Sequence, residues 1–373
     1  MKKQNVFKRT ISIFVVLVMI VLMIPFSMLP TAAVWNGEAD WAFAGGSGTE
    51  SDPYIINTAE QLAYFAEYVN NGYGYSYEYF KLGADIYLNN ASFALDLDSG
   101  LVNVRYYDYG YRTAYLGTGI LGDASGSNTT FDTTASTAGT WYSSPSSTST
   151  TTFSGTLNAW TPIGNNSNSF EGTFDGDGHT VYGLYIDTDQ DQDYQGLFGY
   201  VENNATISNL GVESSYVRAG EYVGGVVGYV RAYGEGISSI VENCYHKGVI
   251  NGYYEVGGIV GCCSATYDNY STASVTVKNC YNTGTIYSYA GSAGGVVGKN
   301  NYNGTVEECY NMGTILGKDY IGGVVGFNDA FSTDSGTPTA RNCYNTGTVK
   351  GFLLITLTVR ISAVLWEEMK IAL

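Results

Sequence analysis

Two short apolar blocks alternate along residues 195–350 and recur as near-copies. The first reads YVGGVVG, EVGGIVG, SAGGVVG and YIGGVVG, and the second reads VENCYHKGVI, VKNCYNTGTI, VEECYNMGTI and ARNCYNTGTV. A weaker copy, QGLFG followed by ATISNLGV, precedes them. Each repeat holds about three short apolar strands separated by Gly and Asn turns. This pattern is typical of one turn of a parallel β-solenoid rather than of a propeller blade.

Alternation within the second block predicts which side chains face the core. Its first and last apolar residues should point inward, while the charged residue after the first should be exposed. A bend at Asn243, Asn279 and Asn342 would return the following Cys to the interior, because Asn tolerates a left-handed backbone. Cys244, Cys280, Cys309 and Cys343 recur once per repeat, which predicts a ladder of buried thiols rather than disulfides. Cys262 and Cys263 break this pattern, and we expect them in a loop as reactive thiols.

Repeat length varies mainly between the end of a GGVVG block and the next Cys block. Loops at this one corner should therefore stack along one edge of the solenoid. Exposed aromatic side chains among short polar residues suit recognition of a glycan or of a host or cell-surface protein. The alternative is a set of stacked tyrosine ladders that only stabilise the coils. The candidate aromatic residues at this edge are Tyr229, Tyr233, Tyr267, Tyr270 and Tyr302.

The chain before the repeats has its own organisation. Residues 34–50 are expected as a flexible lead-in, and residues 51–94 as a capping helix with the first strands. Thr58 and Gln61 form a capping box, followed by apolar residues at helical spacing and by Gly72 as a stop. Residues 95–156 read as a loop excursion with a Ser/Thr-rich tract, and residues 157–350 as the solenoid. One helix before a long β-array would cover the first open coil.

The N-terminal segment 1–33 has a basic start, an apolar run and a small-residue exit at residues 31–33, which predicts a cleaved signal peptide. A retained membrane anchor is the alternative. The formal net charge of the chain is −17, and residues 1–33 hold four cations and no acid, so the remainder carries −17 − 4 = −21. Such an acidic surface disfavours nucleic acid and anionic membranes. We therefore expect a secreted or cell-surface protein that has no membrane contact after signal cleavage.

Candidate chemistry is sparse. The chain has two histidines, His179 and His246, and both are expected as turn and surface residues. No H-E-x-x-H or paired C-x-x-C motif occurs, so we predict no metal, no cofactor and no catalytic residue. The alternative is a polysaccharide-degrading enzyme on the same fold, although fold alone does not grant function. The acidic loop has calcium-like spacing but lacks the Gly and Glu of an EF-hand, and its acids are Asp187, Asp189, Asp191 and Asp193.

The repeats GGVVGYV, GGIVG, GGVVGKN and GGVVGFN, each followed by an NCY-like block, resemble the GLUG-motif repeats of bacterial surface proteins. Residues 160–210 resemble the entry coils that precede such repeats, and the resemblance extends over 54–88 and 160–350. It implies an all-β, right-handed parallel β-helix with an N-terminal capping α-helix, on a secreted or wall-attached protein. Some relatives are metallopeptidases with a separate zinc domain, and no such domain is recognised here. Val or Ile stands where the motif has Leu, except at Leu197.

The last segment, residues 351–373, loses the repeat pattern. A capping strand and a membrane anchor are the simple interpretations. A third follows from the genetic code: in one shifted frame, the codons of residues 362–371 can encode GGIVGRNEN, another repeat. We therefore predict a frameshift within residues 351–361, which would make this chain the repeat region of a larger, truncated surface protein. Sequencing of the gene decides between these alternatives.

Overall fold

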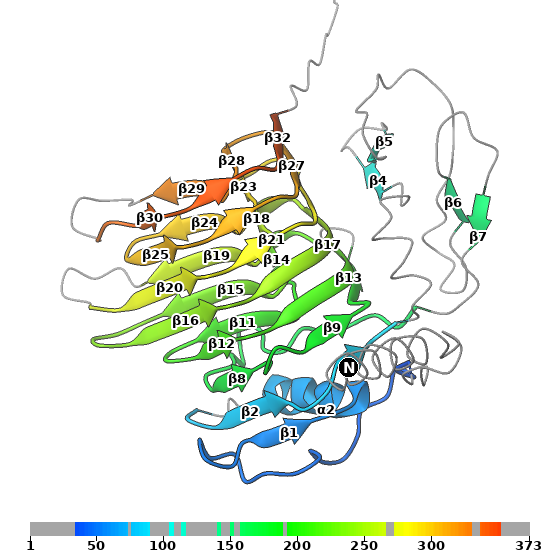
Figure 1. The fold of residues 1–373 in the computed structure, drawn as a ribbon, viewed down its shortest axis with the longest axis vertical. Coiled ribbons are helices and arrows are strands. Elements are labelled where there is room, and N and C mark those ends of the chain that lie inside the picture. Colours follow the sequence, from blue (N-terminus) through cyan, green and yellow to red (C-terminus); the bar gives the residue numbers. More distant parts are fainter. Residues whose placement is uncertain are drawn as a thin grey trace, which may run out of the picture. The chain divides into compact units, whose positions relative to one another are not determined.

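The computed structural model describes residues 34–73, 76–89, 104–107, 113–116, 140–142, 150–152, 157–188, 192–265, 272–329 and 336–351. Its strands stack in register, coil upon coil, into a β-solenoid (Figure 1). Every pairing between strands of successive coils is parallel. Consecutive coils thus satisfy one another's backbone hydrogen bonds along the whole stack. The predicted parallel β-solenoid is confirmed.

The chain passes through four sheets in each repeat. Sheet 1 contains β1 (Tyr54–Ile56), β2 (Tyr79–Leu82), β8 (Thr173–Asp175), β12 (Thr206–Ser208), β16 (Ser238–Glu242), β20 (Ser274–Lys278), β25 (Gly304–Glu307) and β30 (Thr339–Arg341). Sheet 2 contains β3 (Ile86–Tyr87), β9 (Thr180–Tyr182), β10 (Tyr185–Asp187), β13 (Gly211–Arg218), β17 (Tyr245–Gly252), β21 (Tyr281–Asn282), β22 (Thr285–Ser288), β26 (Tyr310–Asn311), β27 (Thr314–Gly317), β31 (Tyr344–Asn345) and β32 (Thr348–Gly351).

The GGVVG block supplies the other two sheets. Sheet 3 contains β14 (Glu221–Gly224), β18 (Tyr254–Gly257), β23 (Ala293–Gly294) and β28 (Ile321–Gly322). Sheet 4 contains β11 (Phe198–Glu202), β15 (Val227–Ala232), β19 (Val260–Ala265), β24 (Val297–Asn301) and β29 (Val325–Asp329). The variable corner lies between sheet 4 and sheet 1, as the repeat lengths predict. Among the described residues of 95–156, β4 (Val104–Tyr107) pairs antiparallel with β5 (Thr113–Leu116), and β6 (Thr140–Tyr142) pairs antiparallel with β7 (Thr150–Thr152).

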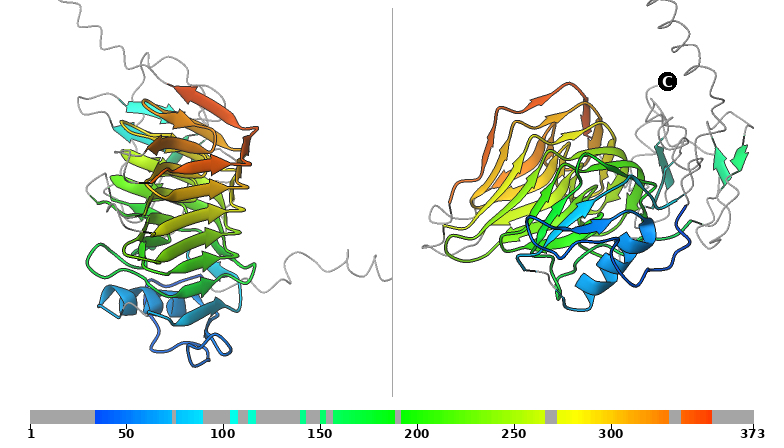
Figure 2. Two further views of the ribbon diagram at one scale, coloured as in Figure 1. Left: turned by 90° about the vertical axis from the view of Figure 1, so that its left-hand side faces the viewer. Right: turned by 60° about the horizontal axis from the view of Figure 1, so that its bottom comes forward.

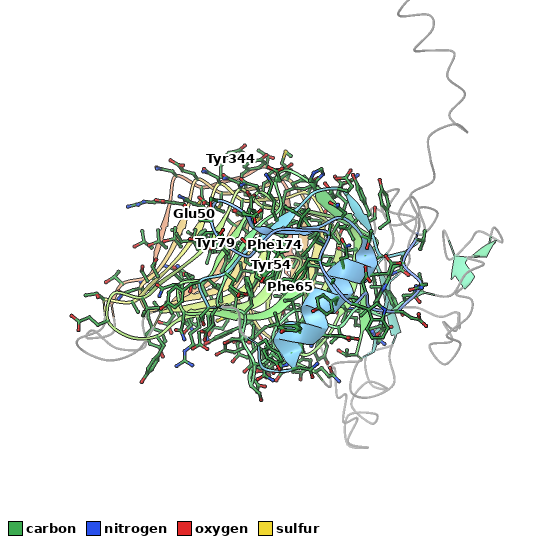
Figure 3. The ribbon with its side chains drawn as sticks, turned by 90° about the horizontal axis from the view of Figure 1, so that it is seen from below. Glu50, Tyr54, Phe65, Tyr79, Phe174 and Tyr344 are labelled. Atoms are coloured by element: carbon green, nitrogen blue, oxygen red, sulfur yellow. The ribbon has the colours of Figure 1, made fainter. Side chains whose placement is uncertain are left out.

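Helix α2 (Ala59–Asn70) covers the first coil (Figure 2). Its capping box forms as predicted, since Thr58 Oγ1 accepts from the backbone N–H of Gln61 at 3.3 Å and Gln61 Oε1 accepts from Asn57 N at 2.8 Å. Beneath the helix lies an aromatic core that includes Phe65 and Phe174 (Figure 3). Within it the rings of Phe65 and Phe80 are stacked with centroids 4.4 Å apart. The helix replaces the neighbouring strand layer that the first coil lacks, and so protects an open sheet edge.

Residues 34–50, expected as a flexible lead-in, pack onto this cap. Trp35 is buried and contacts Trp160 edge to face, with ring centroids 5.7 Å apart. Phe43 stacks on Tyr54 at 4.8 Å. Burial of these large aromatic side chains holds the segment in place. The first strands expected within residues 51–94 include β2 and β3, which are separated by a short turn.

The interior of the repeats follows the predicted alternation. Val241, Val277 and Val306 are fully buried, as are Cys244, Cys280 and Cys309. The bend before each Cys has a left-handed backbone, with φ of 53° at Asn243 and 54° at Asn342. This bend returns the thiol to the core, where burial raises the pKa of Cys280 well above its usual value. Cys343, in the last described coil, is half-buried.

Cys262 and Cys263 correct the prediction of a reactive loop pair. Both lie on β19 and are almost fully buried, and both are free thiols. Burial is the largest cause that raises both thiol pKa values, so the protonated, unreactive form predominates. The prediction was wrong because the residues after this block differ from those after the other GGVVG blocks. Strand β19 nevertheless continues through both cysteines. Within the described ranges, no helix is long and apolar enough to cross a membrane.

Candidate functional site

The five tyrosines predicted at the variable edge do not form one site. Tyr229 lies on strand β15 rather than in a loop and is half-buried. Tyr233 is 56% exposed at the corner, where the Arg231 guanidinium lies 4.9 Å from its ring centroid. Tyr302 lies in a turn with φ of 53°. Tyr267 and Tyr270 lie outside the described residues.

Tyr229 instead belongs to a row of side chains on the outside of the GGVVG blocks, which we call the outer strip. It consists of two aligned columns of residues. The corner column holds the first residue of each GGVVG block, at the start of sheet 3, and the second column holds the residue after the last Gly of the block, on sheet 4. The register of the strands places Tyr200, Tyr229, Cys262, Lys299 and Phe327 directly above one another on sheet 4. The corner column consists of Tyr194, Tyr222, Glu255, Ser292 and Tyr320.

One end of the outer strip is a cluster of four tyrosine rings. Within the corner column, Tyr194 stacks on Tyr222 at 5.0 Å, and on sheet 4 Tyr200 lies 4.9 Å from Tyr229. Tyr222 also meets Tyr229 edge to face at 5.1 Å, which joins the two columns. Burial is the largest cause that raises the pKa of the Tyr222 and Tyr229 hydroxyls. These tyrosines are therefore neutral and able to both donate and accept hydrogen bonds.

The middle of the strip is polar. Lys299 Nζ lies 3.4 Å from Glu255 Oε1, and both side chains are 16% exposed. Cys262 lies below Lys299 in the sheet 4 column. Ser292 follows Glu255 in the corner column and is only 4% exposed. Within the described part of the chain its hydroxyl has no hydrogen-bond partner.

At the far end the strip becomes aromatic again. The rings of Tyr320 and Phe327 are 4.5 Å apart, and Tyr320 is 63% exposed. Lys299 Nζ lies 5.9 Å from the Phe327 centroid, within the range of a cation–π contact. The outer strip thus has aromatic ends and a polar centre. Sequence reasoning missed it. A signal is present in hindsight: the first residue of each GGVVG block and the residue after its last Gly change in type, while the glycines between them stay constant.

A second aromatic array, the tyrosine stack, has a different character. Tyr245, Tyr281, Tyr310 and Tyr344 occupy one position of sheet 2 in four successive coils. Neighbouring ring centroids are 5.1, 4.9 and 5.0 Å apart, and the rings are within 7° of parallel. Because each ring covers the face of the next, the stack matches the stabilising ladder that we considered for the tyrosines. Tyr344 ends the described stack and is 54% exposed at the rim (Figure 3).

His246 corrects the prediction of a surface residue. It is fully buried, with Nε2 2.7 Å from Ser215 Oγ and Nδ1 2.9 Å from Asn282 Oδ1. The Asn282 amide nitrogen donates onward to Asn311 Oδ1 at 2.8 Å, so His246 Nδ1 carries the proton and Nε2 accepts from the Ser215 hydroxyl. Burial lowers the pKa of His246 to about 4, which keeps it neutral. We call Ser215, His246, Asn282 and Asn311 the inner polar column.

The inner polar column resembles a Ser–His–Asn catalytic arrangement in its order of hydrogen bonds. However, Ser215, His246 and Asn282 are all fully buried, so a substrate has no access to the Ser215 hydroxyl. In the next repeats Asn stands where His246 stands, and it continues the same hydrogen bonds. The column therefore satisfies buried polar groups in the core rather than performing chemistry. His179 lies in a turn as predicted, 3.1 Å from Asp85.

Two acids of the acidic loop have partners within the protein. Asp187 Oδ1 accepts from Arg218 Nε at 2.6 Å, and Asp193 Oδ1 accepts from the backbone N–H of Glu221. Asp189 and Asp191 lie outside the described residues. Across the ranges that the structure covers, no group of three or more His, Cys, Asp or Glu side chains could hold a metal ion.

Comparisons with known proteins give two distant relatives. The chain is 29% identical over 182 residues to a "Putative Gly-rich membrane protein" of Evansella cellulosilytica, covering 48% of this chain and 13% of the relative. It is 32% identical over 101 residues to "Halomucin" of Haloquadratum walsbyi, covering 27% of this chain and 1% of the relative. No family model and no solved structure matches the chain. The chain therefore spans a small part of both relatives, and the GLUG resemblance stays a prediction.

Proposed function

We propose that this chain is a non-catalytic repeat protein, secreted or displayed at the cell surface, that serves as an adhesion, binding or spacer module. One observation carries this proposal. The coils keep a constant interior while the outer strip changes from coil to coil, passing from Tyr222 to Glu255 and on to Tyr320. A rigid scaffold with variable outer side chains is the usual basis of recognition by solenoids. We also propose that the repeats are of the GLUG type.

The relatives support the surface location. One is named as a membrane protein and the other as halomucin, and both matches lie in chains far longer than this one. The signal-like segment 1–33 and the strongly acidic composition agree with a location outside the cytoplasm. The buried Ser215 and His246 support a non-catalytic role, since this serine–histidine pair is closed to substrates.

Cell fractionation of the full chain tests this proposal. We expect the chain in the medium or on the outer surface of the producing cells, accessible to added protease and cleaved after residue 33 or a nearby small residue. Incubation with a panel of polysaccharides should release no reducing ends above the level of a heat-treated control. An intracellular chain, or sugar release that requires the folded chain, would contradict it.

A further inference from the structure

We propose that the outer strip is the binding site for an extended, neutral polysaccharide whose chain runs along the stacking direction of the coils. The inference rests on the proposed binding function and names the site and the ligand class. The strip shares only Tyr229 with the five tyrosines predicted at the variable edge.

The spacing of the strip suits a polymer rather than a small molecule. Tyr222 and Tyr229 mark one end, and Tyr320 with Phe327 mark the other, with the coils of Glu255 and Ser292 between them. Successive coils are about 4.8 Å apart, so the two aromatic pairs are separated by roughly 14 Å. This distance accommodates several consecutive sugar rings of one extended chain.

The chemistry of the strip suits sugars. A pyranose ring has apolar C–H faces, which pack on aromatic rings, and a rim of hydroxyls, which need donors and acceptors. Tyr320 offers its exposed ring to such a face. In the polar centre, Glu255 accepts and Lys299 donates, and both side chains keep 16% of their surface exposed. The Ser292 hydroxyl of the same row is buried, so the polar contacts to a sugar come from Glu255 and Lys299.

The charge of the strip and of the chain favours a neutral ligand. The Lys299 ammonium is compensated by Glu255, so the centre presents no excess positive charge. The chain carries a net charge of −17, which repels polyanions such as uronic acid polymers. The tyrosine stack is a poorer site for sugars, because each of its rings covers the face of its neighbour, as Tyr281 and Tyr310 do at 4.9 Å.

Affinity electrophoresis of the full chain tests the inference in gels that contain hydroxyethyl cellulose, galactomannan or polygalacturonate. We expect retardation by at least one of the two neutral polymers and none by polygalacturonate. Tyr320→Ala should weaken that binding roughly tenfold, as loss of an aromatic hot-spot contact does. The matched control is Tyr344→Ala, which removes a similarly exposed tyrosine from the same coil, outside the strip, and should leave the retardation unchanged.

A second variant separates binding from folding. Lys299→Met keeps the length of the side chain but removes the donor of the polar centre, so it should weaken retardation while the urea midpoint of unfolding reports separately on folding. Equal retardation of wild type, Tyr320→Ala and Lys299→Met would overturn the strip as the site but leave a binding function in place. Retardation by polygalacturonate alone, or by no polymer, would overturn the inference, while cell fractionation decides the surface location independently.

Discussion

The tyrosine stack and the outer strip are both built from one residue per coil, yet they differ in what they repeat. The stack places tyrosine at the same position in four coils, with ring spacings of 4.9 to 5.1 Å. The strip carries tyrosine, Glu255, Ser292 and again tyrosine along its corner column. A repeated residue gains from an identical neighbour on both sides, whereas a varied one does not. The comparison suggests that repeated columns hold the coils together and varied columns are free to recognise a partner.

Asn311→Ala, in the inner polar column, should have the largest effect on stability. Asn311 Oδ1 accepts from Asn282 at 2.8 Å and from the backbone N–H of Gly313 at 3.2 Å, so truncation leaves two buried donors unpaired. We expect a loss of about 4 kcal/mol in the free energy of unfolding, measured by urea denaturation. Asn345→Ala, at the exposed end of the column, is the control and should cost less than about 1 kcal/mol. Equal costs would remove the case for a cooperative column.

His246 should make stability depend on pH. Its pKa falls from 6.5 to about 4 on folding, so the unfolded chain binds the proton more readily. The stability that comes from keeping His246 neutral is fully present above pH 6.5 and is lost as the pH falls toward 4. The loss in the free energy of unfolding should reach up to about 3 kcal/mol. Urea denaturation of wild type and of His246→Asn across this range isolates the effect, because Asn is the residue of the neighbouring coils. Parallel pH profiles of the two proteins would show that His246 is not responsible.

Tyr281→Ala should separate the two aromatic arrays. It removes a ring that stacks on both Tyr245 and Tyr310, at an expected cost of about 2 kcal/mol in the free energy of unfolding. The matched change in the strip, Tyr320→Ala, removes a mostly exposed ring with one close neighbour and should cost less than about 1 kcal/mol. Thermal or urea denaturation checks both values. The contrast between the arrays fails if the strip variant is the less stable one.

Glu308→Asn should have the smallest effect, and it should stabilise the protein. Glu308 interrupts the column of bend residues and has φ of 56°, a left-handed conformation that Asn adopts at lower cost. We expect a gain of about 0.5 to 1 kcal/mol in urea denaturation. The reverse change, Asn279→Glu, places Glu at a bend with φ of 53° and should lose a similar amount. If both variants were stabilised, or both destabilised, the bend conformation would not be the cause of the change in stability.

The sequence was sufficient to predict the coils because the same local pattern occurs in all four repeats. The capping box, the inward Val and Cys positions, the Asn bend and the variable corner could all be predicted from spacing alone. Cys262, Cys263 and His246 were misplaced because each departs from its repeat in residue type while keeping its place in the strand register. Register places a side chain in or out of the core more reliably than residue type does.

The outer strip was missed because it joins residues that are adjacent only after folding. Tyr222 and Tyr229 are seven positions apart on different sheets, and a rule of strict alternation along one strand does not bring them to one face. The GGVVG turn does so in every coil, and the pairing of Glu255 with Lys299 then links neighbouring coils. Only the stacking of coils shows that the variable ends of the blocks form a continuous surface.

Protection of individual tyrosines from nitration, read by peptide mass spectrometry, tests the division between repeated and varied columns most directly. The full chain would be treated with tetranitromethane with and without a saturating amount of the neutral polysaccharide that retards it most. Three exposed tyrosines report on three surfaces: Tyr320 on the strip, Tyr344 on the stack and Tyr233 at the variable corner. We predict protection of Tyr320 alone. Protection of Tyr344 or Tyr233 with Tyr320 unchanged would contradict the account.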